Sequence, residues 1–164
     1  MPKRTFIQTA AFALILSGTA LAQTTQVTFG GMKSDSSLPV EITSDSLTVD
    51  QAASTALFTG DAVVIQGDLK LSSKTLFVEY SQEDKAVQTI TADGQVLLVN
   101  PTDAIEADHA VYTVATGLVV LTGKVLMTQG QSAISAQSMV IDLTTGLGQM
   151  EGRVTTTFVP GKKK

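Results

Sequence analysis

The feature of this sequence that most constrains its fold is an internal repeat with a constant spacing of 63 residues, as between Asp45 and Asp108. Five short segments recur at that spacing without a gap: ITSD (42–45) and IEAD (105–108), TG (59–60) and TG (122–123), QG (66–67) and QG (129–130), LS (71–72) and IS (134–135), LFVE (76–79) and MVID (139–142). Each copy is long enough for about five or six strands. One copy stacked on the other therefore extends a pair of sheets rather than forming two closed barrels, and leaves unpaired edge strands at both ends.

Short apolar runs rich in Val, Leu, Ile and Thr follow one another from residue 39 onward, separated by Gly, Asp, Asn and Ser. No long stretch has the 3.6-residue period of a helix, so the pattern predicts an all-β fold of antiparallel hairpins. Gly60-Asp61, Gly67-Asp68, Asp93-Gly94, Gly117 and Gly146 are expected to form turns or β-bulges.

Composition excludes several classes of function. The 164 residues include no Cys and one His, with a net charge of −4. A disulfide framework, a Cys nucleophile and a His-rich metal centre are therefore ruled out, and an acidic chain lacks the basic face that nucleic acids require. We expect no cofactor and no bound metal.

The chain divides into four parts. Residues 1–22 have a basic start, an apolar middle and the ending Ala20-Leu21-Ala22, the pattern of a cleaved signal peptide. Residues 23–38 are polar and are expected to form a flexible lead-in. Residues 39–160 form the β domain, and residues 161–164 form a basic tail that we expect to be solvated.

Several stretches of the β domain resemble the OstA-like domain family. They are PVEITSDSLTVD (39–50), FTGDAVVIQG (58–67), VVLTGKVLMTQG (119–130) and GRVTTTFVP (152–160). Within that family, a single domain behind a signal peptide is similar to the LptA-like periplasmic proteins of lipopolysaccharide transport. The resemblance implies a twisted, open β-jellyroll of two antiparallel sheets with a hydrophobic groove. It also implies a periplasmic protein that binds lipopolysaccharide, carries it between the membranes and is not an enzyme.

Strand alternation indicates which side chains would line that groove. Residues with the same parity in each strand point to one face of a sheet. Small aliphatic side chains could make a thin, filled core or leave room for an apolar ligand, and composition alone favours the former. With the resemblance, the expected lipid-binding residues are Leu47, Val49, Phe58, Val64, Leu76, Val78, Leu98, Tyr112, Val114, Leu121, Val125, Met127, Met139 and Ile141.

The two ends of the sheet stack are the expected docking surfaces. The first strand, 39–43, and the final strand, 154–159, would leave backbone groups free for strand addition. Expected docking residues are Val40, Ile42, Val154, Thr156 and Phe158. The resemblance implies that these ends join protomers head to tail, and join the chain to LptC-like inner-membrane and LptD-like outer-membrane components.

The sequence gives little indication of a catalytic site. His109 lies beside Asp108, but its parity places it on the solvent face without a nucleophile. Asp45 and Asp108 hold equivalent positions in the repeat, which points to a structural role at a bend where a strand begins. Two alternative functions remain open: a membrane-anchored LptC-like component, if residues 1–22 are retained, and an exported sugar-binding β-protein.

Overall fold

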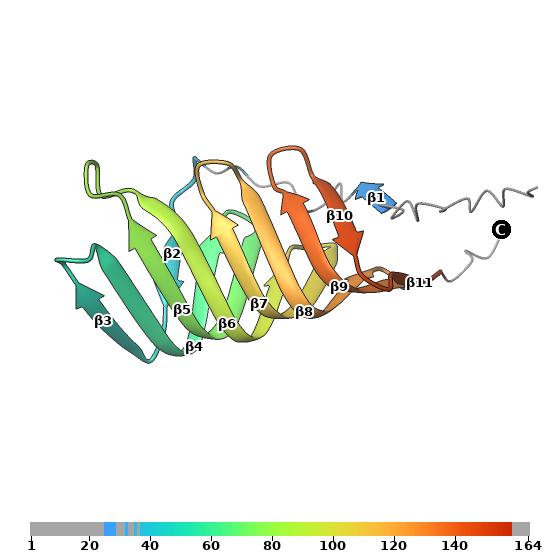
Figure 1. Cartoon of the computed structure of the whole chain (residues 1–164), viewed down its shortest axis with the longest axis horizontal. Coiled ribbons are helices and arrows are strands. Elements are labelled where there is room, and N and C mark those ends of the chain that lie inside the picture. Colours follow the sequence, from blue (N-terminus) through green and yellow to red (C-terminus); the bar gives the residue numbers. More distant parts are fainter. Residues whose placement is uncertain (1–24, 29–31, 33–34, 36, 159–164) are drawn as a thin grey trace, which may run out of the picture.

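The computed structural model describes residues 25–28, 32, 35 and 37–158. The predicted signal peptide and basic tail lie outside these residues. The described chain is all-β and forms one 11-stranded sheet (Figure 1). Its strands are β1 (Thr25–Thr28), β2 (Glu41–Thr43), β3 (Ser46–Asp50), β4 (Thr55–Gln66), β5 (Leu69–Tyr80), β6 (Val87–Val99), β7 (Asp103–Thr113), β8 (Leu118–Gln129), β9 (Ser132–Asp142), β10 (Leu147–Glu151) and β11 (Thr155–Thr157).

All strand pairs are antiparallel, and β4 to β9 follow one another as hairpins. The repeat seen in the sequence is also a structural repeat, because β4 and β8 are separated by 63 residues at both ends. The segment from β2 to β3 likewise corresponds to β7. No helix in the described part of the chain is long and apolar enough to cross a membrane.

The sheet is folded along a line of bulges that crosses the middle of every long strand. Register shifts interrupt the β4–β5, β5–β6, β6–β7, β7–β8 and β8–β9 ladders near the strand centres. Pairs of consecutive residues with positive φ mark this line, in which a glycine is followed by a second left-handed residue: Gly60-Asp61, Gly94-Gln95, Gly123-Lys124 and Gly152-Arg153. Bulges bend a strand, and glycine adopts positive φ without steric cost. We call this line the corner.

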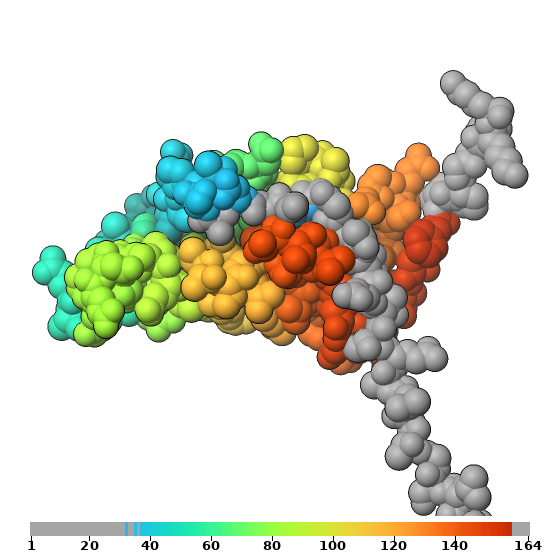
Figure 2. All heavy atoms as spheres, turned by 90° about the horizontal axis from the view of Figure 1, so that it is seen from above, coloured from blue at the N-terminus to red at the C-terminus, as the bar shows by residue number. Residues whose placement is uncertain are grey.

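The corner divides the sheet into two layers that face each other. Layer 1 consists of β1, β3, β10 and residues 55–59, 75–80, 87–93, 109–113, 118–122 and 138–142. Layer 2 consists of β2, β11 and residues 62–66, 69–73, 96–99, 103–107, 125–129 and 132–136. The hairpin turns of both layers lie opposite the corner and border what we call the mouth. Figure 2 looks down on these turns, which form two rows.

This architecture confirms the predicted open β-jellyroll and refines it, since the two faces belong to one continuous sheet. Gly60-Asp61, expected as a turn or β-bulge, is a bulge, so the apolar runs 57–59 and 62–66 on either side of it are halves of one bent strand. Gly60 and Gly94 lie in the corner, whereas Gly67, Gly117 and Gly146 lie in turns at the mouth.

Two described parts of the segment 23–38, which was expected to be a flexible lead-in, are held against the β domain. Thr25–Thr28 forms β1, which pairs with β10 at the C-terminal end of the sheet. Met32 is fully buried in the core. β1 thereby covers the edge of β10, which is one way in which proteins protect an edge strand.

Candidate functional site

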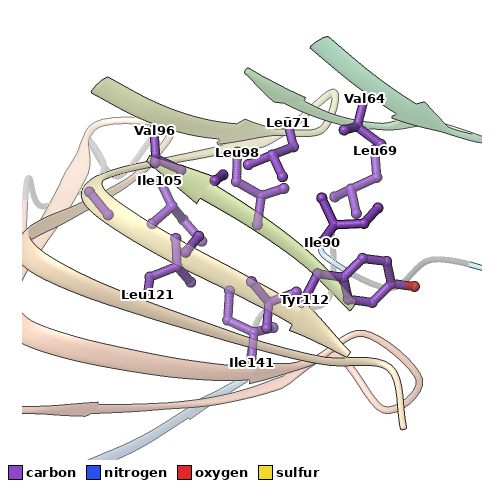
Figure 3. Close-up of a cluster of buried hydrophobic side chains, with 14 of the residues drawn as sticks. Val64, Leu69, Leu71, Ile90, Val96, Leu98, Ile105, Tyr112, Leu121 and Ile141 are labelled. Carbon is purple, nitrogen blue, oxygen red and sulfur yellow. The ribbon is translucent and has the colours of Figure 1, made fainter. Parts of the chain in front are cut away.

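The inner faces of the two layers make one continuous apolar surface, which we call the groove face. Figure 3 shows side chains from both layers converging on it. Of the predicted lipid-binding residues, the buried ones are Phe58, Val64, Leu76, Val78, Leu98, Tyr112, Leu121, Val125, Met127, Met139 and Ile141. Val114 is partly buried against the same cluster. Strand parity therefore identified the side of the sheet correctly for all of these residues.

Leu47 and Val49 lie on the same face but are 54% and 57% exposed. They pair with Phe58 and Ala56 of β4, both buried, so their side chains point to the groove face. They are uncovered because β3 is an edge strand that pairs, among the described residues, with β4 alone. The groove face is thus open to solvent at the β2–β3 end of the molecule.

Further members of the groove face were not among the expected lipid-binding residues. They include Met32, Ile90, Val96, Ile105, Val119, Leu143 and Met150. Ile90 lies in the first half of β6, whose sequence VQTITA has few large apolar residues and gives a weak strand signal. Val96 lies in the second half and has the parity of Leu98, so alternation could have found it. Met150 has the inward parity of β10, directly across from Met139, and could have been found from alternation alone.

Two polar side chains lie within this apolar surface near the mouth. Tyr112 of layer 1 donates its hydroxyl proton to Oε1 of Gln66 in layer 2, at 3.1 Å. Gln66 Nε2 in turn donates to the Leu38 carbonyl at 3.0 Å, just before β2. Both side chains are at least 95% buried. Burial raises the pKa of the Tyr112 hydroxyl, because ionisation there would place a charge away from water.

The predicted docking residues lie at the two ends of the sheet. Val40 and Ile42 are half-buried against the core at the β2–β3 end. Val154, Thr156 and Phe158 are exposed at the opposite end, Phe158 by 73%. Thr156 pairs with Ile134, which packs against the core, so Thr156 continues the groove face at that end. The structure adds one edge strand at each end: β3 pairs with the first half of β4, and β1 pairs with β10.

The titratable groups singled out from the sequence lie away from the groove face. His109 Nδ1 and Asp93 Oδ1 are 2.6 Å apart across the β6–β7 ladder, and both side chains are exposed. Asp45 and Asp108 lie at the corner, packed against Gly60 and Gly123. Among the described residues, no three His, Asp or Glu side chains gather closely enough to hold a metal ion.

Comparison with known proteins assigns the family. Residues 41–147 match the model of the LptA/(LptD N-terminal domain) LPS transport protein family. The chain belongs to the LptA/LptD N-terminal domain family. This confirms the resemblance to OstA-like domains that the sequence motifs indicated.

Two further similarities accompany the family match. An uncharacterised protein of Rhizobium meliloti (strain 1021) is 29% identical over 110 residues, 67% of this chain and 59% of that relative's length. The chain thus matches little more than half of the relative. The crystal structure of LptH, described as the LptA-homologous periplasmic component of the lipopolysaccharide transport device of Pseudomonas aeruginosa, superposes with a TM-score of 0.69 at 19% identity. The match covers 77% of this chain and 99% of LptH, and shows that the fold is shared.

Proposed function

We propose that this member of the LptA/LptD N-terminal domain family is a periplasmic carrier of lipopolysaccharide, which holds the acyl chains of the lipid against the groove face. One observation carries the proposal: a single apolar surface runs from edge to edge of the sheet and is uncovered at Leu47 and Val49. The family description and the fold shared with LptH support it.

The physical requirement for such a carrier is apolar area. Burying a methylene group is worth about 0.8 kcal/mol, so exposing one acyl chain of about a dozen carbons to water costs on the order of 10 kcal/mol. A carrier therefore needs a continuous apolar trough with an opening for the sugar headgroup, and needs no acid–base groups. The groove face supplies the apolar surface, which is exposed at Leu47 and Val49 at the β2–β3 end and is otherwise buried between the two layers.

The same proposal includes assembly into a bridge between the two membranes. Within the described part of the chain, each end of the sheet has edge strands whose outer backbone groups are unpaired, and each end also exposes groove-face side chains. Pairing of these edges would extend both the sheet and the apolar trough into the next molecule. We infer head-to-tail self-association, with an LptC-like inner-membrane component at the β2–β3 end and an LptD-like outer-membrane component at the β11 end.

Photo-crosslinking at adjacent residues tests the lipid-binding face. A crosslinking residue at Leu98 or Tyr112, both on the groove face, should trap lipopolysaccharide in cells. The controls are their chain neighbours Leu97 and Thr113, which lie on the same strands and point to the other side of the sheet. Equal labelling of both members of each pair would refute the proposal.

A second experiment distinguishes a carrier from a membrane-anchored component. The intact mass of the protein purified from the periplasm shows whether residues 1–22 are removed, as a carrier requires and an anchored component does not.

A further inference from the structure

The hydrogen bond between Tyr112 and Gln66 has a particular place in the fold. Tyr112 lies in β7 of layer 1, two residues before the strand-to-turn boundary at Val114, and Gln66 is the last residue of β4 in layer 2. The bond therefore joins the two layers across the mouth, at the side opposite the corner. Figure 3 shows the Tyr112 ring at the margin of the apolar cluster, with its hydroxyl directed away from that cluster.

The mouth is where the layers must separate for acyl chains to reach the groove face. The long strands are continuous through the corner, so the layers cannot part there without breaking ladders of backbone hydrogen bonds. At the mouth, the contacts between the described parts of the two layers include a hydrogen bond between side chains. The Tyr112–Gln66 bond is buried, and Gln66 also ties the Leu38 carbonyl to the same point.

An acyl lipid brings its own polar groups to this position. Its chains end in amide or ester carbonyls where they join the sugar, at the boundary between apolar tail and wet headgroup. Tyr112 and Gln66 lie at the corresponding boundary of the protein, between the groove face and solvent. A buried hydroxyl without an acceptor destabilises the state that contains it, so Tyr112 needs a new acceptor wherever the entering lipid separates it from Gln66 and excludes water.

We propose that the Tyr112–Gln66 hydrogen bond is a latch, which opens when the Tyr112 hydroxyl exchanges Gln66 for an acceptor on the lipid. In the empty protein it holds the two layers together at the mouth. When acyl chains enter, the Tyr112 hydroxyl leaves Gln66 and donates to a carbonyl of the amide or ester linkage, while the ring remains on the groove face. This inference rests on the proposed function and names a recognition site within it.

Two substitutions separate the latch from a merely structural bond. Gln66→Leu removes the competitor for the Tyr112 hydroxyl, so lipid should load faster and bind roughly three- to tenfold more tightly, the factor that one hydrogen bond makes. Tyr112→Phe opens the latch but also removes the donor to the lipid. It should load faster without a gain in affinity. A purely structural bond would lower the melting temperature in both variants and leave the loading rate unchanged.

Stopped-flow mixing of the mature protein with fluorescently labelled lipopolysaccharide measures the loading rate and the affinity for lipid, with Tyr80→Phe as the matched control. The chain has no Trp and two Tyr, so Tyr80→Phe also leaves Tyr112 as its sole tyrosine emitter. In that variant the tyrosine fluorescence should change on loading. Wild-type loading rates in both latch variants, or an unchanged Tyr112 signal while lipid binds, would overturn the latch and leave the carrier function standing. Failure of the wild-type protein to take up lipid would overturn both.

Discussion

The side chain of Asp108 lies directly against the backbone of Gly123, where β7 and β8 turn the corner. A Cβ atom built on Gly123 would be 2.7 Å from the Asp108 Cβ, closer than real Cβ atoms approach other atoms. Asp45 lies in the same way on Gly60, 63 residues earlier, and Gln137 lies on Gly152. The repeat therefore preserves a close contact between neighbouring strands where they bend at the corner.

Gly123→Ala should destabilise the protein by at least about 2 kcal/mol. The substitution forces an alanine into a φ of +79° and also drives its methyl group into Asp108. Urea unfolding followed by circular dichroism measures the loss. Gly130→Ala is the matched control: its φ is +58°, but an added Cβ meets nothing within 4 Å. The control should cost about 1 kcal/mol, from the backbone alone. Equal losses in the two variants would show that the contact with Asp108 is unimportant.

Much of this fold could be predicted because its signals are local or repeated. Alternation along β5 placed Leu76 and Val78 inward, and both are fully buried. Exposure at Leu47 and Val49 could not be predicted in the same way. Their parity is correct, but their exposure depends on β3 being an edge strand, which is a property of the whole sheet.

The parts that could not be predicted depend on pairing between distant segments. The pairing of Thr25 with Met150 joins the first and last parts of the domain. No pattern in the polar sequence around Met32 predicts this pairing. Likewise, Gln66 and Gln129 are equivalent in the repeat, yet Gln66 is buried and Gln129 is exposed. The difference follows from Tyr112 and Leu38, which reach Gln66 from elsewhere in the chain.

Met32→Ala should lower the free energy of unfolding by about 2–5 kcal/mol, the usual cost of truncating a buried methionine. Met32 is fully buried, whereas the rest of the sequence around it is polar. Phe158→Ala is the control, because that larger side chain is 73% exposed and should cost less than about 0.5 kcal/mol. Thermal unfolding of both variants provides the comparison. A Met32→Ala protein as stable as the wild type would mean that the segment before β2 contributes nothing to the core.

Leu47→Asp should weaken head-to-tail association of the protein while leaving each molecule folded. The charge would lie on the exposed end of the groove face, where a docking neighbour would have to desolvate it. Thr48→Asp is the control, since it carries the same charge one residue along β3 on the outer side of the sheet. Analytical ultracentrifugation over a range of concentrations should show a loss of oligomers for the first variant alone. Identical sedimentation of the two variants would argue against docking through the groove face.

A pair of variants, one at each end of the sheet, tests the same interface independently. Ile42→Asp places a charge beside the core at the β2 edge, and deletion of residues 154–164 removes β11 and Phe158. Each change should reduce self-association from its own end. Mixing the two variants should restore one intact junction between them. It should give dimers but no larger oligomers, because each molecule retains one competent end. Unchanged oligomers in both variants would refute docking through the edge strands.

The ionisation of Tyr112 should make the folded protein sensitive to alkaline pH. Burial raises the pKa of its hydroxyl above the usual value of about 10, so the neutral form is favoured by folding. The resulting stabilisation is fully present below the pKa of the unfolded chain and is lost as pH rises through the folded-state pKa. In a Tyr80→Phe protein, tyrosinate absorbance at about 295 nm should titrate at higher pH in buffer than in urea. Tyr112→Phe should unfold with a weaker dependence on pH above about 10 than the wild type. Coincident titrations in buffer and urea would contradict the burial of this hydroxyl and, with it, the hydrogen bond that closes the mouth.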